Sequence, residues 1–225
     1  MPLLGQAAML LSFDVVADAV DEHDDWHTHE HLPERLSIPG FNRGTRWVAL
    51  TGTPRYFVCY EVGHLSTLTS AAYLERLNNP SPWTTKIMPG YRGMSRGLCT
   101  VTGSFGAGLG NASLLVRFKP PPGAEPLLRA RLLQEVLAEL PSMPGLGSAH
   151  LFEGAATPVM TKEQSIRGAD ATVDWAVLVI GYSQGALAEL AQQTLGSQQL
   201  AQWGATGVLS AVYRLDYSLS VQEVV

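Results

Sequence analysis

Four of the six histidines in this chain of 225 residues fall between positions 23 and 31. His23, His27 and His31 are each four residues apart, a spacing that places side chains close to one face of a helix. An imidazole gains and loses a proton near neutral pH, which suits acid–base catalysis and hydrogen bonding to a substrate. The spacing therefore predicts a chemically active helix face with His31 at its centre.

Charged residues near this segment can support His31. Glu30 or Glu34 can orient the imidazole, because a carboxylate accepts a hydrogen bond from a ring nitrogen. Arg43 and Arg46 can stabilise an anionic or enolate oxygen of a substrate. We predict His31, Glu34, Arg43 and Arg46 as the catalytic residues.

Aromatic residues close to the histidines are predicted to form the walls of a pocket. Trp26 and Trp47 can supply apolar surface, and Tyr60 can supply a phenol. Ordinary packing in the core is the alternative for each of these aromatic side chains. We predict Trp26, His27, Trp47 and Tyr60 as substrate-binding residues, and a small apolar or aromatic molecule as the ligand.

Two other interpretations of the histidine segment stay open. His27 and His31 have the spacing of metal ligands, with Glu30 or Glu34 as a third ligand, but no HExxH motif is present and we predict no metal. Alternatively, His23, His27 and His29 are solvated helix residues, and His31 bonds to the backbone before the Pro39-Gly40 turn.

The chain repeats itself around this segment. Pro39-Gly40 returns as Pro144-Gly145, an offset of 105 residues (144 − 39), and each copy reads as β-α-β-β-α-β. The second copy has no histidine at the corresponding helix. Strands are expected over 8–16, 41–50, 55–62, 91–101, 113–118, 149–153, 174–181 and 208–218, and helices over 20–36, 68–77, 127–140 and 185–194. Pro33 either breaks the first helix or opens a second helical piece.

This pattern predicts an α+β protein made of two tandem ferredoxin-like units. Residues 1–102 form the first unit, which bears the site, and residues 111–225 form a mainly structural second unit with an insertion over 154–173. Residues 103–110 contain four glycines and are expected to be a flexible linker. The apolar sheet faces are predicted to pack against each other as an intrachain pseudo-dimeric α/β barrel.

A longer motif carries a family resemblance. It runs from Trp26 through His31-Leu32-Pro33-Glu34-Arg35 and Pro39-Gly40-Phe41 to Arg46-Trp47. This motif resembles that of the dimeric α/β-barrel superfamily, near the EthD-like group. The resemblance implies a pocket between the helices and the sheet of one unit, with His31 facing it. The superfamily includes monooxygenases, muconolactone-type isomerases, polyketide cyclases and haem enzymes.

The resemblance allows a haem, but the sequence has no axial-ligand signature. It also has no phosphate loop, flavin motif or Rossmann fingerprint, and we predict no cofactor. Gly181-Tyr182-Ser183-Gln184-Gly185 has the spacing of a hydrolase nucleophile elbow. The catalytic histidine of such hydrolases follows the serine in the chain, and no histidine follows His150, so a serine hydrolase is not predicted.

Composition narrows the class of partner. A net charge of −5 argues against nucleic-acid binding, and no apolar run is long enough for a membrane span. The first 16 residues lack a basic segment and read as a strand, not a signal peptide. The two cysteines give no disulfide framework. We expect a cytoplasmic protein, with a homo-oligomer of pseudo-dimers as an option.

The sequence favours a small-molecule enzyme with a mostly apolar pocket in the first unit, centred on His31. Proton-transfer reactions fit such a pocket: cofactor-independent oxygenation, isomerisation or cyclisation. The alternative is a non-catalytic ligand-binding or stress-related protein on the same scaffold.

Overall fold

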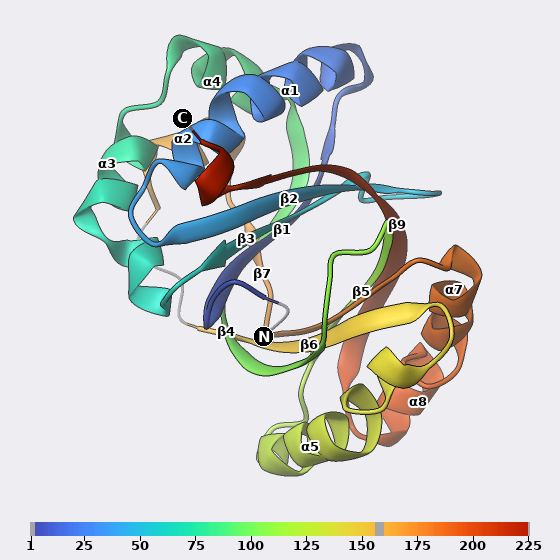
Figure 1. Cartoon of the computed structure of the whole chain (residues 1–225). Helices are drawn as coiled ribbons and strands as arrows, with labels where there is room; N and C mark the ends of the chain where they lie inside the picture. Colours follow the sequence, from blue (N-terminus) through green and yellow to red (C-terminus); the bar gives the residue numbers. More distant parts are fainter. Residues whose placement is uncertain (1–2, 156–159, 225) are drawn as a thin grey trace.

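The computed structural model describes residues 3–155 and 160–224 (Figure 1). The first half contains β1 (Ala7–Val15), α1 (Val20–Trp26), α2 (Leu32–Leu36), β2 (Phe41–Ala49), β3 (Tyr56–Val62), α3 (Ala71–Asn78), α4 (Pro82–Ile87) and β4 (Tyr91–Gly106). The second half contains β5 (Ala112–Lys119), α5 (Glu125–Arg131), β6 (Leu146–Gly154), α6 (Lys162–Arg167), β7 (Ala171–Thr172), β8 (Trp175–Gly181), α7 (Gln184–Gln192), α8 (Ser197–Gln202) and β9 (Thr206–Ser220).

The strands form one closed sheet. Its order is β1-β3-β2-β9-β5-β8-β6-β4, and β4 pairs again with β1, which closes an antiparallel barrel. The short strand β7 adds to β4 in parallel. The predicted α+β class and the predicted barrel are confirmed. The barrel is one continuous sheet, however, and not two sheets stacked face to face, because hydrogen bonds join the halves at β2–β9 and β4–β6.

Both halves have the same internal strand order. In each, the first strand lies between the third and the fourth, and the second strand lies beside the third. The two Pro-Gly turns also match, because Gly40 and Gly145 both adopt a left-handed conformation, with φ of +94° and +89°. That the halves are copies of one unit stays a prediction.

The predicted linker is wrong in its first part. Strand β4 extends through Gly106 and pairs with β6. The glycines here allow close packing and do not add flexibility: a Cβ on Gly103 would lie 2.2 Å from Leu133, and one on Gly106 would lie 2.1 Å from the carbonyl oxygen of Gly147.

The histidine-bearing segment is helical from Val20 to Leu36 and contains a π turn over 27–31. Pro33 lies in the first turn of α2, just after the π turn, where its missing N–H is tolerated. Of the two predicted outcomes for Pro33, the second helical piece is correct. The second half has a π turn at the same place in its own helix, over Leu132–Leu137.

Helices cover the barrel on two sides. Figure 1 shows α1 to α4 on one side and α5, α7 and α8 on the other. Among the described residues, buried apolar side chains form one cluster under each helical layer and a third cluster that includes Trp47, Phe57 and Phe152 inside the barrel. In the same residues, no helix has both the length and the apolar character needed to cross a bilayer.

Cys59 and Cys99 belong to the interior cluster and are free and buried. Ser183 caps helix α7 by accepting a hydrogen bond from the backbone N–H of Ala186 at 3.3 Å. Its role in the structure is therefore that of a helix cap.

Candidate functional site

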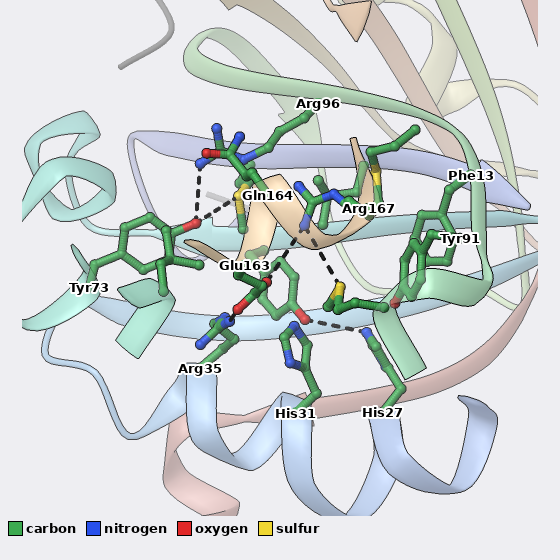
Figure 2. A pocket seen from close by; sticks show the side chains of 16 residues that line it. Phe13, His27, His31, Arg35, Tyr73, Tyr91, Arg96, Glu163, Gln164 and Arg167 are labelled. Atoms are coloured by element: carbon green, nitrogen blue, oxygen red, sulfur yellow. Dashed lines mark hydrogen bonds and ion pairs between the residues drawn. The ribbon is translucent and has the colours of Figure 1, made fainter. Parts of the chain in front are cut away.

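A small cavity lies between the helices of the first half and the outer face of the barrel (Figure 2). Its volume is about 30 Å³, which is room for about one water molecule. The lining residues are Met9, Leu11, Phe13, His27, His31, Arg35, Tyr60, Tyr73, Leu77, Met88, Tyr91, Met94, Arg96, Glu163, Gln164 and Arg167. The cavity therefore combines thioether and aromatic walls with several buried charges.

The helical spacing brings three histidines together. The rings of His23 and His27 are 5.6 Å apart, and those of His27 and His31 are also 5.6 Å apart. All three side chains are buried. The alternative of solvated histidines is therefore wrong for His23 and His27, whereas His29 is half-exposed and bonds to the carbonyl oxygen of Asp25.

His31 has no hydrogen bond to any described residue, and its buried Nδ1 has no partner. The proposed bond from His31 to the backbone is therefore not formed. Trp26 packs against it, with ring centroids 4.3 Å apart, and so supports the imidazole from behind without lining the cavity. Burial, reinforced by the positive charge of Arg35, holds the pKa of His31 well below its usual value. The imidazole is neutral at pH 7 and can accept a proton.

His27 is also buried and neutral. Its Nε2 lies 3.3 Å from the hydroxyl oxygen of Tyr60, and its Nδ1 has no partner. Burial lowers the pKa of His27 well below its usual value and raises that of Tyr60. Tyr60 therefore keeps its proton and can donate it in a hydrogen bond, as the prediction of a phenol in the pocket requires.

His23 lies one turn further from the cavity. Its Nδ1 is 3.0 Å from a carboxylate oxygen of Asp24, and its Nε2 is 3.1 Å from the hydroxyl of Tyr91. The carboxylate requires a proton on Nδ1, and so Tyr91 donates to Nε2. His23 thereby fixes the orientation of Tyr91, which lines the cavity.

Three arginines also line the cavity: Arg35, Arg96 and Arg167. Arg35 pairs with Glu163 through a short hydrogen bond, and Arg167 lies 3.7 Å from the same carboxylate. Burial lowers the pKa of Arg35, but Glu163, Tyr73, Glu34 and Tyr60 together raise it by more, and so the pKa lies above its usual value. The Arg35 guanidinium is therefore charged inside the protein.

Helix α6 supplies Glu163, Gln164 and Arg167 to the cavity. It belongs to the insertion of the second half and packs against α3 and against the turn at Met88–Gly90. In Figure 2 it lies above the histidines, which point up from their helix. The expectation of a pocket built from residues 1–101 alone is therefore wrong, since the second half contributes part of the wall.

Five predicted residues lie outside the cavity, and Trp26, which was expected in the pocket wall, is one of them. Glu34 pairs with Arg35 at 3.3 Å and so acts on the site through that arginine. Trp47 packs inside the barrel, because adjacent residues of a strand face opposite sides of the sheet. Its predicted place in the pocket wall is wrong.

Arg43 and Arg46 are on strand β2, at the seam between the halves. Arg43 pairs with Glu61 at 2.7 Å, and Arg46 pairs with Asp216 at 2.7 Å. These ion pairs hold structural elements together, and neither arginine lines the cavity. Their predicted catalytic placement is wrong, because β2 leads away from the cavity toward the seam.

Sequence reasoning missed Arg35, Arg96 and Glu163. A signal existed for Arg35, which follows His31 by four residues and therefore continues the same helix face. No local signal marks Arg96 or Glu163, since each reaches the site through tertiary packing.

The corresponding layer of the second half is apolar. At the offset of 105 residues, His23, His27, His31 and Arg35 become Leu128, Leu132, Val136 and Leu140, and all four are buried. The backbone frame and the π turn are shared, whereas the polar groups occur on one side only. This contrast agrees with the predicted asymmetry between the halves.

The donor set does not resemble a metal site. In residues 3–155 and 160–224, no three His, Cys, Asp or Glu side chains are grouped so that they could hold a metal ion. Glu30, the suggested third ligand, instead accepts hydrogen bonds from Trp26 Nε1 at 3.1 Å and from the hydroxyl of Ser81. The cavity is also far smaller than a haem, and its residues do not fit that cofactor in this conformation.

No protein-family model matches the sequence, and no curated protein matches it significantly. Solved structures do match. An anthrone oxidase-like protein superposes with a TM-score of 0.65 at 10% sequence identity, over 100% of this chain and 98% of the other. A ferredoxin fold protein from Listeria monocytogenes, related to antibiotic biosynthesis monooxygenases, gives 0.51 at 10% identity over 96% and 97%.

The fold is a ferredoxin-like α/β barrel. A proposed monooxygenase from Lactobacillus acidophilus has the same fold, with a TM-score of 0.60 at 8% identity over 96% of each chain. The match spans nearly the whole of each protein, and so the shared fold includes both halves of this chain. Identities this low show the shared fold alone, and the narrower likeness to EthD-like proteins stays a prediction.

Proposed function

We propose that this ferredoxin-like α/β barrel is a small-molecule enzyme that transfers protons in the cavity beside His31. One observation carries the proposal: His31 is a buried, neutral imidazole without a hydrogen-bond partner among the described residues, and it lines a cavity. A buried imidazole kept free of other bonds is available to accept a proton from a bound molecule.

The walls favour an apolar or aromatic substrate. Methionine and aromatic side chains make up much of the lining, among them Met9, Phe13, Met88 and Tyr91. The cavity of about 30 Å³ is too small for such a molecule. Substrate binding therefore requires an outward movement of part of the wall, and α6, which comes from the insertion of the second half, is the part expected to move.

The chemistry would begin with removal of an acidic C–H proton by His31. The resulting carbanion is an enolate if a carbonyl is adjacent. Protonation at another carbon completes an isomerisation, attack on a second carbonyl completes a cyclisation, and reaction with dioxygen completes an oxygenation. All three predicted reaction types share this first step, and it is the step that can be tested.

Anthrone is a suitable probe, since the first structural neighbour described above is called anthrone oxidase-like. Its C10 protons are acidic because their loss gives an aromatic enolate. Exchange of these protons in deuterated water under argon reports the first step alone. With oxygen present, one anthrone and one dioxygen give one anthraquinone and one water, which an oxygen electrode can follow.

The test compares His31→Gln with His29→Gln. Gln keeps a polar side chain but cannot act as a base near neutral pH, and so we expect at least a roughly 100-fold loss of exchange in His31→Gln. His29 is on the same turn, half-exposed and outside the cavity, and its variant should match the wild type. Undiminished exchange in His31→Gln would disprove the proposal.

A non-catalytic ligand-binding protein is the second candidate. The cavity lining supports it as well, because aromatic and thioether walls with buried arginines can bind a ligand whether or not a reaction follows. Anthrone binding detected by quenching of tryptophan fluorescence, without C10 exchange above the buffer rate, would select this alternative.

A further inference from the structure

Arg96 is the least compensated charge in the cavity wall. It is on strand β4, opposite Leu11 of β1, and only 4% of its surface is exposed. A guanidinium stays protonated in proteins, and so this position carries a full positive charge away from water.

Arg96 makes few contacts through its guanidinium within the described part of the chain. Nη2 donates to the hydroxyl oxygen of Tyr73 at 3.3 Å, and that hydroxyl contacts the Met9 sulfur at 3.2 Å. Nη1 is buried and has no partner among the described residues. Neither contact supplies a negative charge to Arg96.

The nearby carboxylates are already engaged by other arginines. Glu163 pairs with Arg35 and Arg167, and Asp170 pairs with Arg167 at 2.8 Å. In the described part of the chain, no carboxylate forms an ion pair with Arg96. A buried charge without a counter-ion is strongly unfavourable, which is why such groups concentrate at functional sites.

The second half lacks this cation. The strand pairing that sets Arg96 opposite Leu11 sets Ser210 opposite Val116, at the same offset of 105 residues from Leu11. Ser210 is exposed. The charge is therefore restricted to the half that has the buried histidines and the cavity.

We propose that Arg96 binds an anionic oxygen of the ligand through Nη1, so that the substrate class is an aromatic or apolar molecule with a single carboxylate or enolate group. This rests on the proposed function only in that both concern the same cavity. Arg96 is a specificity-determining residue here: its charge selects an anion, whereas the methionine and aromatic walls accept the apolar body.

Binding of three naphthalene derivatives tests the proposal by titration calorimetry. 2-Naphthoate is an anion at neutral pH, and 2-naphthamide is neutral and of similar shape. 2-Naphthol is mostly protonated in solution at that pH and becomes an anion only in a site that stabilises the naphtholate. We expect the wild type to bind 2-naphthoate or 2-naphthol at least tenfold more tightly than 2-naphthamide. Whichever of the two binds more tightly identifies the oxygen as a carboxylate or as a phenolate-like enolate.

Arg96→Met removes the charge but keeps an unbranched side chain. We expect it to weaken binding of the preferred anion at least tenfold while 2-naphthamide stays within twofold. Arg96→Lys keeps the charge without the planar fork and should cause a smaller loss. Arg92→Met alters an exposed arginine of the same strand and should change nothing.

Three results would overturn the proposal. They are equal wild-type affinity for charged and neutral probes, no wild-type binding of either anion at millimolar concentration, or unchanged anion affinity in a cooperatively folded Arg96→Met variant. These experiments also distinguish failure of this inference from failure of the proposed function. Arg96-dependent naphthoate binding without anthrone exchange retains this inference and rejects the enzyme, and His31-dependent exchange without anion binding does the reverse.

Discussion

His31 and Arg96 line the same cavity and would interact with a ligand in two different ways. The neutral imidazole of His31 can take a proton, and the guanidinium of Arg96 can hold the negative charge that proton loss creates. Both side chains are buried without adequate partners, which costs folding free energy. Residues that weaken the fold in this way are characteristic of sites selected for function.

The cost at Arg96 can be measured. Arg96→Met replaces an uncompensated buried charge by an apolar chain next to Met9 and Tyr73, and we expect a gain of about 1–3 kcal/mol in the free energy of unfolding. Urea denaturation without ligand measures it. A variant less stable than the wild type would show that the charge is compensated after all.

At the residue scale, sequence indicates position best where the arrangement is local. His27, His31 and Tyr60 line one cavity, because helical spacing already groups the histidines, and their roles stay predictions. Trp47 was misplaced, since a strand alternates its faces and sequence alone does not reveal which face meets the cavity. Arg96 and Glu163 could not be found, because only tertiary folding brings them beside His31.

At the scale of the element, the histidine helix has an apolar counterpart in the second half. Replacing His23, His27 and His31 by Leu, Leu and Val would copy the residues found there, Leu128, Leu132 and Val136. Such a variant tests what three buried imidazoles do to stability.

Burial lowers the pKa of all three histidines below the value of about 6.5 that they have in the unfolded chain. Below that pH the unfolded chain binds more protons than the folded protein, and so the free energy of unfolding decreases as the pH falls. Each histidine contributes up to about 1.4 kcal/mol per pH unit. Denaturation at pH 7 and pH 5 should show a smaller decrease in the triple variant than in the wild type. Equal decreases would contradict the buried, neutral state.

Helix α6 is attached to the first half mainly through charge. Glu163→Ala leaves Arg35 buried with Glu34 as its remaining ion-pair partner, and we expect a loss of about 3 kcal/mol in the free energy of unfolding. Glu34→Ala should cost less, because the Glu34 carboxylate is 17% exposed against 5% for Glu163. Hydrogen exchange should also become faster in α6 of Glu163→Ala. A larger loss in Glu34→Ala would reverse this ranking.

At the scale of the whole molecule, the closed sheet should unfold as one unit. Cys59 and Cys99 test this, because burial raises the pKa of both thiols, that of Cys99 to about 12, and makes them unreactive in the folded barrel. Labelling with a thiol reagent in increasing urea should follow the loss of circular dichroism in a single transition. Labelling of either cysteine well before that transition would show that the barrel opens locally.

Much of the fold followed from pattern alone. Alternating apolar residues and the two Pro-Gly turns predicted the strands and their order within each half. A barrel was also expected, but the hydrogen bonds that close it were not, because they join β2 with β9 and β4 with β6, which are far apart in the chain. The packing of α6 against the first half could not be predicted either, for the same reason.

The two seams have a further consequence. Each half taken alone would present two unpaired strand edges, which bind other strands readily. Joining the halves in one chain gives each edge a high effective concentration of its proper partner. An assembly of separate subunits dissociates on dilution, whereas this barrel keeps its second half, and with it the α6 wall of the cavity, at any protein concentration.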